Sequence, residues 1–199
     1  MTSSLSELCN LIANHGIEHA KNLSSIFQNI AQEKVGEKIG SKESKIIFKV
    51  FSFLNWAYAN GVWSNLSNTK LRRDLMSESM KSIVLRTAYE LSENKQNENV
   101  AMFAVDLDQE FRDFAMNYND RLKELGRSGH EPDANTALLY GLEGIQEKIG
   151  LDDSDMELIV PAFLEQSGDF AEIESIANQV NLSSAERKNK GFFSRLFGS

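Results

Sequence analysis

A five-residue pattern near the start of the sequence contains three side chains that could hold a metal ion. His15, Gly16, Ile17, Glu18 and His19 have the pattern H-x-x-E-H. On a helix, His15 and His19 would lie one turn apart on one face, so that both imidazoles could bind one ion with Glu18 near a bound water. The spacing therefore raises a metal-dependent enzyme as one alternative function.

This pattern resembles the motif of the inverzincin metalloproteases over these five residues. The resemblance implies zinc-dependent peptide hydrolysis with His15 and His19 as ligands. Gly16, however, predicts a break between two helices, and no later segment announces a third ligand. We therefore favour two surface or interhelix histidines over a metal site, and expect no metal and no cofactor.

Acidic residues gather in two further places that could be taken for metal sites. His130, Glu131 and Asp133 fall on an expected loop, where the carboxylates suit the first turn of a following helix. The second place is LDDSDME, residues 151–157, where Ser154 and Glu157 have the S-x-x-E spacing of a capping box. Capping explains both groups without a metal ion.

The segment KGFFSRLFGS, residues 190–199, is the strongest indication of function. Its large apolar residues occupy positions i, i+1, i+4 and i+5, beginning at Phe192. A helical turn would therefore bring them to one face, with positive charges around it. This pattern is typical of a segment that inserts into a membrane surface or docks in a groove of another protein. The predicted contact residues are Lys188, Lys190, Phe192, Phe193, Arg195, Leu196 and Phe197.

The end of this tail also resembles a known peptide class. FSRLF, residues 193–197, is similar in its Leu-Phe end to the sliding-clamp-binding peptides of bacterial replication proteins, with Phe193 where they have glutamine. A third alternative is structural, with the tail packed on its own core or on a twin subunit.

Charge is distributed unevenly along the chain, whose net charge is −8. Residues 1–95 carry 12 Lys and Arg against 9 Asp and Glu, residues 96–180 carry 5 against 19, and residues 181–199 carry 4 against 1. The acidic part should repel phosphate backbones, so we expect no nucleic-acid partner. A solvated acidic surface is the simplest interpretation, and a basic partner is the alternative.

Helical periodicity dominates the sequence. Apolar residues recur at steps of three and four, strand-like alternation is never sustained, and only 2 prolines interrupt the chain. The predicted fold is all-α, a bundle of about eight helices with a basic aromatic C-terminal tail. Expected helices cover 4–14, 17–36, 42–60, 69–94, 97–126, a segment beginning near Pro132 and ending before Gly150, 154–164 and 169–180.

The same patterns suggest an internal organisation. We expect a mildly basic N-terminal part, 1–95, an acidic part, 96–180, packed on it within one domain, and the tail, 181–199. Helix 42–60 is apolar around its circumference and should be central, with an end at Asn60-Gly61 and Trp63 in the following loop. Lys49, Asn55 and Asn60 argue against a membrane span over 46–63.

The composition suggests a compartment and, with the tail, a function. Cys9 is the single cysteine, so an internal disulfide is excluded, and the N-terminal residues lack a basic leader. We expect a cytoplasmic protein, with peripheral membrane contact as an option. The leading hypothesis is a non-enzymatic adaptor or regulatory protein that binds an unidentified protein partner or a membrane surface through its tail; the alternatives are the metal-dependent enzyme and a structural homo-oligomer such as a homodimer.

Overall fold

Helices account for nearly all of the folded chain. The computed structural model describes residues 5–36, 39–64, 66–92, 97–127, 134–167, 170 and 172–178. Within these ranges the chain is all-α, and a short helical segment at 172–178 follows six longer helices. The six are α1 (Leu5–Lys34), α2 (Ser41–Ser64), α3 (Thr69–Leu91), α4 (Asn97–Arg127), α5 (Ala134–Ile149) and α6 (Asp153–Gln166).

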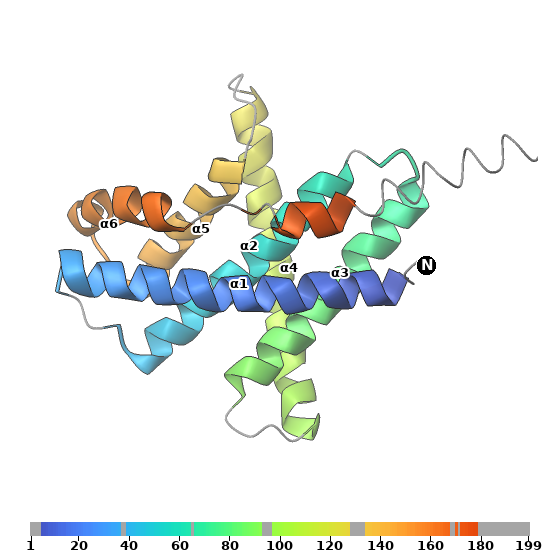
Figure 1. The fold of residues 1–199 in the computed structure, drawn as a ribbon, viewed down its shortest axis with the longest axis horizontal. Helices are drawn as coiled ribbons and strands as arrows, with labels where there is room; N and C mark the ends of the chain where they lie inside the picture. Colours follow the sequence, from blue (N-terminus) through green and yellow to red (C-terminus); the bar gives the residue numbers. More distant parts are fainter. Residues whose placement is uncertain are drawn as a thin grey trace, which may run out of the picture.

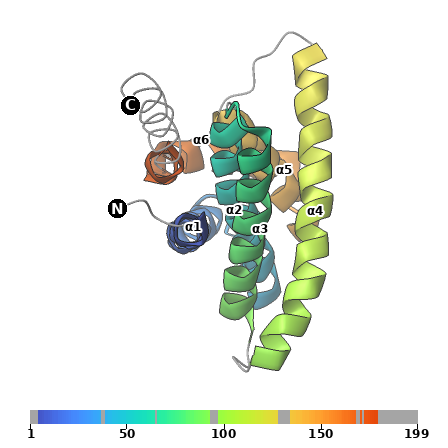
Figure 2. The same ribbon diagram turned by 90° about the vertical axis from the view of Figure 1, so that its right-hand side faces the viewer.

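The helices are arranged in layers around α2. In Figure 2, α1 and α4 lie on opposite sides of the molecule, with α2, α3 and α5 between them. Figure 1 shows α4 running across the direction of α1. Helix α2 packs against α1, α3 and α5, while α4 packs on α3 and α6 packs on α1. The acidic helices therefore cover the helices of the basic part from several sides.

The centre of the fold is the middle of α2, as its apolar sequence predicts. Phe51 is fully buried and lies between Phe27 of α1 and Phe163 of α6, at ring-centroid distances of 6.4 and 5.4 Å. Phe53 faces α4 and contacts Phe111 at 5.8 Å. Burying a large apolar side chain contributes about 1.5–3 kcal/mol, so these rings supply much of the stability of the bundle.

A second core cluster lies where α1 begins and α2 ends. It joins Cys9, Ile12 and Trp63 to Ile173 and other residues of the segment 172–178. Trp63 is fully buried, and its indole Nε1 donates a hydrogen bond to the backbone carbonyl of Ala177 at 3.2 Å. The prediction that Trp63 lies in a loop was wrong, because α2 continues through Asn60-Gly61 to Ser64.

The expected break at Gly16 was also wrong, since α1 is one helix from Leu5 to Lys34. A Cβ atom at Gly16 would lie 3.1 Å from Cβ of Asn55 in α2 and 3.6 Å from Cδ1 of Ile83 in α3. The glycine thus serves close packing of three helices. The helix around it keeps its hydrogen bonds, and tertiary packing offsets the entropy cost of about 0.5–1 kcal/mol.

The N-cap of helix α6 lies two residues earlier than predicted. Asp152 is the N-cap: its side chain accepts from the backbone N–H of Asp155, whose carboxylate accepts from the N–H of Asp152. The predicted pairing of Ser154 with Glu157 is therefore wrong, although a capping box is present. The hydrogen bond from Ser154 and that from the Asp155 backbone lower the pKa of Asp152. Pro161 lies inside α6 without ending it.

Among the described helices, none is long and apolar enough to cross a membrane. This includes α2, whose lysines interrupt its apolar surface.

Candidate functional site

The residues predicted to contact a partner or a membrane all belong to the C-terminal tail. Lys188, Lys190, Phe192, Phe193, Arg195, Leu196 and Phe197 lie outside the residues that the structure describes. Their role stays a prediction from sequence. His130, Glu131 and Asp133 are outside the described residues as well.

The three residues of the H-x-x-E-H pattern have separate partners. His15 Nδ1 lies 2.9 Å from Oε1 of Glu172. Glu18 forms an ion pair with Lys21, with 2.9 Å between Oε1 and Nζ. His19 Nδ1 lies 2.8 Å from Oδ1 of Asn55. In the described ranges, no three metal-binding side chains converge. A metal ion bound by both histidines would therefore lack a third protein ligand from these parts of the chain.

His19 and Asn55 instead form a polar contact inside the helical core. Asn55 is fully buried, and its Nδ2 donates to the carbonyl of Phe51 at 2.8 Å. Because Nδ2 of Asn55 is the donor to Phe51, its Oδ1 is the acceptor, and Nδ1 of His19 donates to it. The ring edge of His19 meets Phe170 at 4.9 Å. This arrangement satisfies a buried amide and fixes how α1 crosses α2.

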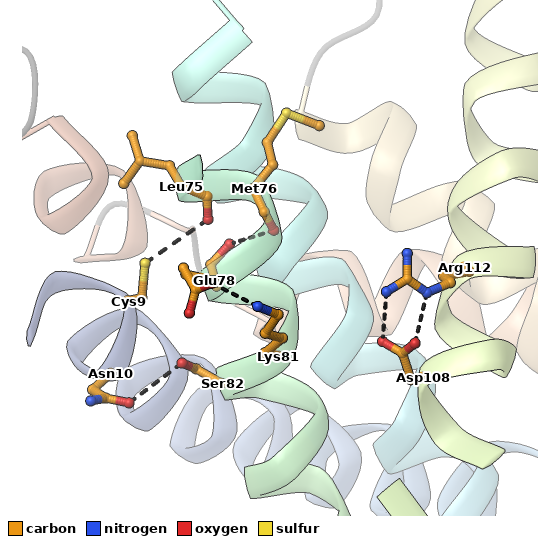
Figure 3. Close-up of polar contacts among 10 residues, drawn as sticks. Cys9, Asn10, Leu75, Met76, Glu78, Lys81, Ser82, Asp108 and Arg112 are labelled. Atoms are coloured by element: carbon orange, nitrogen blue, oxygen red, sulfur yellow. Dashed lines mark hydrogen bonds and ion pairs between the residues drawn. The ribbon is translucent and has the colours of Figure 1, made fainter. Parts of the chain in front are cut away.

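Cys9 has the environment of a structural thiol rather than a nucleophile. It is fully buried in α1, and its Sγ lies 3.9 Å from the carbonyl oxygen of Leu75 in α3 (Figure 3). Burial, with a smaller contribution from the charge of Glu78, raises the pKa of the thiol to about 11. At neutral pH the thiolate that attacks electrophiles is scarcely populated.

Acidic side chains on α4 are engaged in local surface contacts. Asp108 forms an ion pair with Arg112, one helical turn later (Figure 3). The distance from Nε of Arg112 to Oδ2 of Asp108 is 2.7 Å. Asp113 accepts from Gln109 at 2.8 Å, and Asp120 pairs with Lys123 at 2.7 Å. Exposed pairs of this kind contribute about 0.3–0.5 kcal/mol each and indicate a solvated face.

One concave surface stands out from this background, and we call it the lysine groove. It has a volume of about 530 Å³ and lies between the first half of α2, the end of α3 and the start of α4. Its lining residues are Lys42, Lys45, Ile46, Lys49, Leu91, Ser92 and Phe103. Three of these described lining residues are lysines, in a chain whose net charge is −8.

The geometry of α2 produces this concentration of charge. Lys42, Lys45 and Lys49 are three and four residues apart, so their side chains follow one ridge of the helix. At 1.5 Å per residue, the ridge spans about 10 Å. Ile46 lies between them, and its partly exposed side chain shares the groove with Phe103 of α4.

The groove continues toward α5 as a smaller cavity of about 200 Å³. Lys49, 22% exposed, lies at the junction and pairs with Glu110 at 2.6 Å. Beyond it, Lys148 Nζ lies 5.8 Å from the ring centroid of Phe114. Positive charge and aromatic surface thus extend together along this side of α2.

On the other side of Lys45, a cavity of about 510 Å³ adjoins Lys21 and Glu90. Lys21 pairs with Glu18 at 2.9 Å and with Glu90 at 3.3 Å. The hydrogen bond to Glu18 is the main cause of a raised pKa at Lys21. Two carboxylates therefore balance the charge of Lys21, as Glu110 balances that of Lys49.

The lysine groove was not predicted from the sequence. Lys49 was interpreted only as an interruption of an apolar segment, and no role was predicted for Lys42 and Lys45. The signal that could have found them is their spacing on one helical face. The apolar floor could not have been found in this way, because Leu91 and Phe103 come from two other helices.

No protein-family model, no curated protein and no solved structure matches this chain.

Proposed function

We propose that this chain is a non-enzymatic adaptor or regulatory protein that contacts a protein partner or a membrane surface through its tail, residues 181–199. Supporting this proposal, the tail combines three phenylalanines and a leucine at helical spacing with surrounding cations. Such a segment gains about 1.5–3 kcal/mol for each large apolar side chain that it buries, which offsets the cost of ordering it.

One observation about the folded body favours an adaptor over the metal-dependent enzyme. His15, Glu18 and His19 have separate partners, Glu172, Lys21 and Asn55, which give each residue a structural role. A shared metal would need a third ligand from outside the described ranges. Elemental analysis of the purified protein tests the alternative, which requires about one equivalent of zinc, iron or manganese.

A structural homo-oligomer remains the second candidate because apolar side chains stand exposed on α4. Met102, Val105 and Met116 are 68%, 71% and 58% exposed. They lie on a helix whose inner face already packs on α3, so a twin subunit could cover them. Light scattering of the full chain and of a form without residues 187–199 separates tail-mediated association from α4-mediated association.

Affinity capture tests the adaptor proposal itself. Full-length protein and a form lacking residues 187–199 would serve as paired baits in lysate of the native cell, with vesicle flotation run beside them. A matched control keeps the tail length but replaces Phe192, Phe193, Leu196 and Phe197 by serine. The proposal requires partners or vesicle binding to be lost from both altered forms; unchanged partners, vesicle binding and self-association would contradict it.

A further inference from the structure

We propose that the outer face of α4 is a docking site for a basic amphipathic helix of another protein. Met102, Val105 and Met116 define this face, and we call them the methionine stripe. All three side chains are more than half exposed. They belong to the described body of the protein, so the inference does not depend on the tail.

Only one side of α4 packs on the described body. Its buried residues include Ala104, Leu107 and Phe111, and the helix packs on α3. In Figure 2, α4 runs along the edge of the molecule, and no described helix lies beyond it. With 3.6 residues per turn, the methionine stripe lies about 140–180° around the helix from Leu107. The stripe therefore faces away from the core.

The methionine stripe has the spacing of a coiled-coil seam. Val105 lies three residues after Met102, and Met116 lies two heptads after Met102. The seam positions between them are occupied by Gln109 and Arg112, which both bond to neighbours along α4. Methionine side chains adapt to differently shaped partners, and a facing helix could insert its own apolar residues between them. A straight row at this spacing fits a helix.

Two carboxylates beside the stripe indicate the charge of the partner. Asp106 and Asp113 are exposed and two helical turns apart, so they lie on one flank of the stripe, about 10 Å from each other. Within the described ranges, Asp106 has no hydrogen-bond or ion-pair partner, and Asp113 accepts only the neutral amide of Gln109. Three further carboxylates of α4 already pair with cations and add no free charge: Asp108, Glu110 and Asp120. Asp106 and Asp113 are therefore available to lysines or arginines of a docked helix.

The same two carboxylates disfavour other occupants of the stripe. They would repel anionic lipid head groups and the phosphates of a nucleic acid. A second copy of α4 is disfavoured as well. An antiparallel pair of α4 helices centred on Gln109 would bring Asp106 of one copy beside Asp113 of the other, where like charges repel. A basic helix instead places apolar residues on the stripe and cations on its acidic flank.

Fluorescence anisotropy with a defined probe tests this proposal. The probe is a labelled helix of about 16 residues, with leucines at the seam positions and lysines on both flanks. Two comparison peptides replace every lysine by glutamate or disperse the same leucines around the helix. Saturable binding of the first peptide alone, weakened by added salt, is the expected result because exposed ion pairs are screened.

Variants of the stripe locate the binding. Met102→Gln with Val105→Gln should weaken binding of the probe at least about tenfold, because two apolar contacts are lost. The matched control is Leu139→Gln with Leu158→Gln, which changes two exposed leucines of α5 and α6. Because these positions lie on other helices, the control should change the affinity less than about twofold.

Charge variants provide a second readout. Asp106→Asn with Asp113→Asn should weaken binding of the probe about threefold to tenfold and reduce its salt dependence. The matched control is Glu157→Gln with Glu165→Gln, which removes the same net charge from exposed positions of α6. It separates pairing beside the stripe from attraction to the whole acidic protein, and should change the affinity less than about twofold.

Three other outcomes would overturn the proposal. The first is the absence of saturable binding to the unaltered protein, or equal weakening by the stripe variants and their controls. The second is a dimer, followed by light scattering, that Met102→Gln with Val105→Gln abolishes while the probe does not bind, which would assign the stripe to a second copy. The third is binding of a peptide of residues 181–199 in place of the probe, which would assign the stripe to the tail of this chain.

Discussion

The two halves of α2 share one helix and have opposite surroundings. From Phe51 to Ala57 every residue is buried, including the polar Ser52 and Asn55. From Ser41 to Lys49, only Ile47 and Phe48 are buried, and the three lysines are exposed or partly exposed. The comparison shows that a helix can organise the core with one half and present a charged groove with the other.

The difference follows from the neighbours of each half. The second half is enclosed by α1, α3, α4, α5 and α6, whose apolar residues meet there in one cluster. The first half lies beside the end of α3, where two concave surfaces of about 530 and 510 Å³ adjoin it. Substitutions in the second half should therefore lower stability strongly, and substitutions of the exposed residues in the first half should change it little.

The largest effect is expected from Phe51→Ala, which empties the space between Phe27 and Phe163. We expect the free energy of unfolding to fall by about 3–5 kcal/mol, measured by urea denaturation. Leu158→Ala is the control, because this side chain is 55% exposed on α6. A loss below 1 kcal/mol for Phe51→Ala would contradict its central position.

The core beside the end of α2 should shield Cys9. Because burial raises its pKa to about 11, the folded state holds a proton that the unfolded thiol loses above about pH 9. Stability should therefore fall as the pH rises from 9 to 11, by up to about 2 kcal/mol relative to Cys9→Ala. At pH 8 a thiol reagent should modify the folded protein at least about 100-fold more slowly than the urea-unfolded chain.

The α1–α2 crossing is tested by enlarging Gly16. Gly16→Leu should destabilise the protein by about 1–3 kcal/mol, because the added atoms meet Asn55 at the helix contact. The matched substitution Gly61→Leu lies in the same bundle, on α2, where a Cβ meets nothing within 4 Å. It should stabilise by about 0.5–1 kcal/mol through helix propensity, so equal effects of the two would refute the close approach.

The smallest effect belongs to the first half of α2. Lys42→Glu should raise stability by about 0.3–1 kcal/mol, because an acidic residue suits the first turn of a helix. The measurement is urea denaturation at low ionic strength, repeated at high salt, where the gain should shrink. Destabilisation by this substitution would indicate a structural role for Lys42 that the geometry does not show.

The sequence was sufficient for some parts of this structure because their signals are local. The amphipathic pattern of α4 predicted Asn97–Arg127 to within one residue, and the apolar circumference of α2 predicted its central place. Gly16 and Asn60-Gly61 were misread, because a glycine that serves close packing or a continuing helix has the same local pattern as one that ends it.

The candidate site was less accessible to sequence reasoning. Its lysines follow a helical spacing that could be read from the chain, but a groove needs walls from three helices. Phe103 is 54 residues from Lys49, and only packing brings them together. The tail could be described from sequence alone, and its contacts stay a prediction.

Amide hydrogen exchange tests the division of α2 most directly. The exchange of each backbone amide of α2 would be followed by NMR under native conditions. We expect the amides of 51–57, where every side chain is buried, to exchange only through global unfolding, and the amides of 44–46, where the side chains are partly exposed, to exchange much faster. Equal protection of the two halves, or faster exchange in 51–57, would contradict the account.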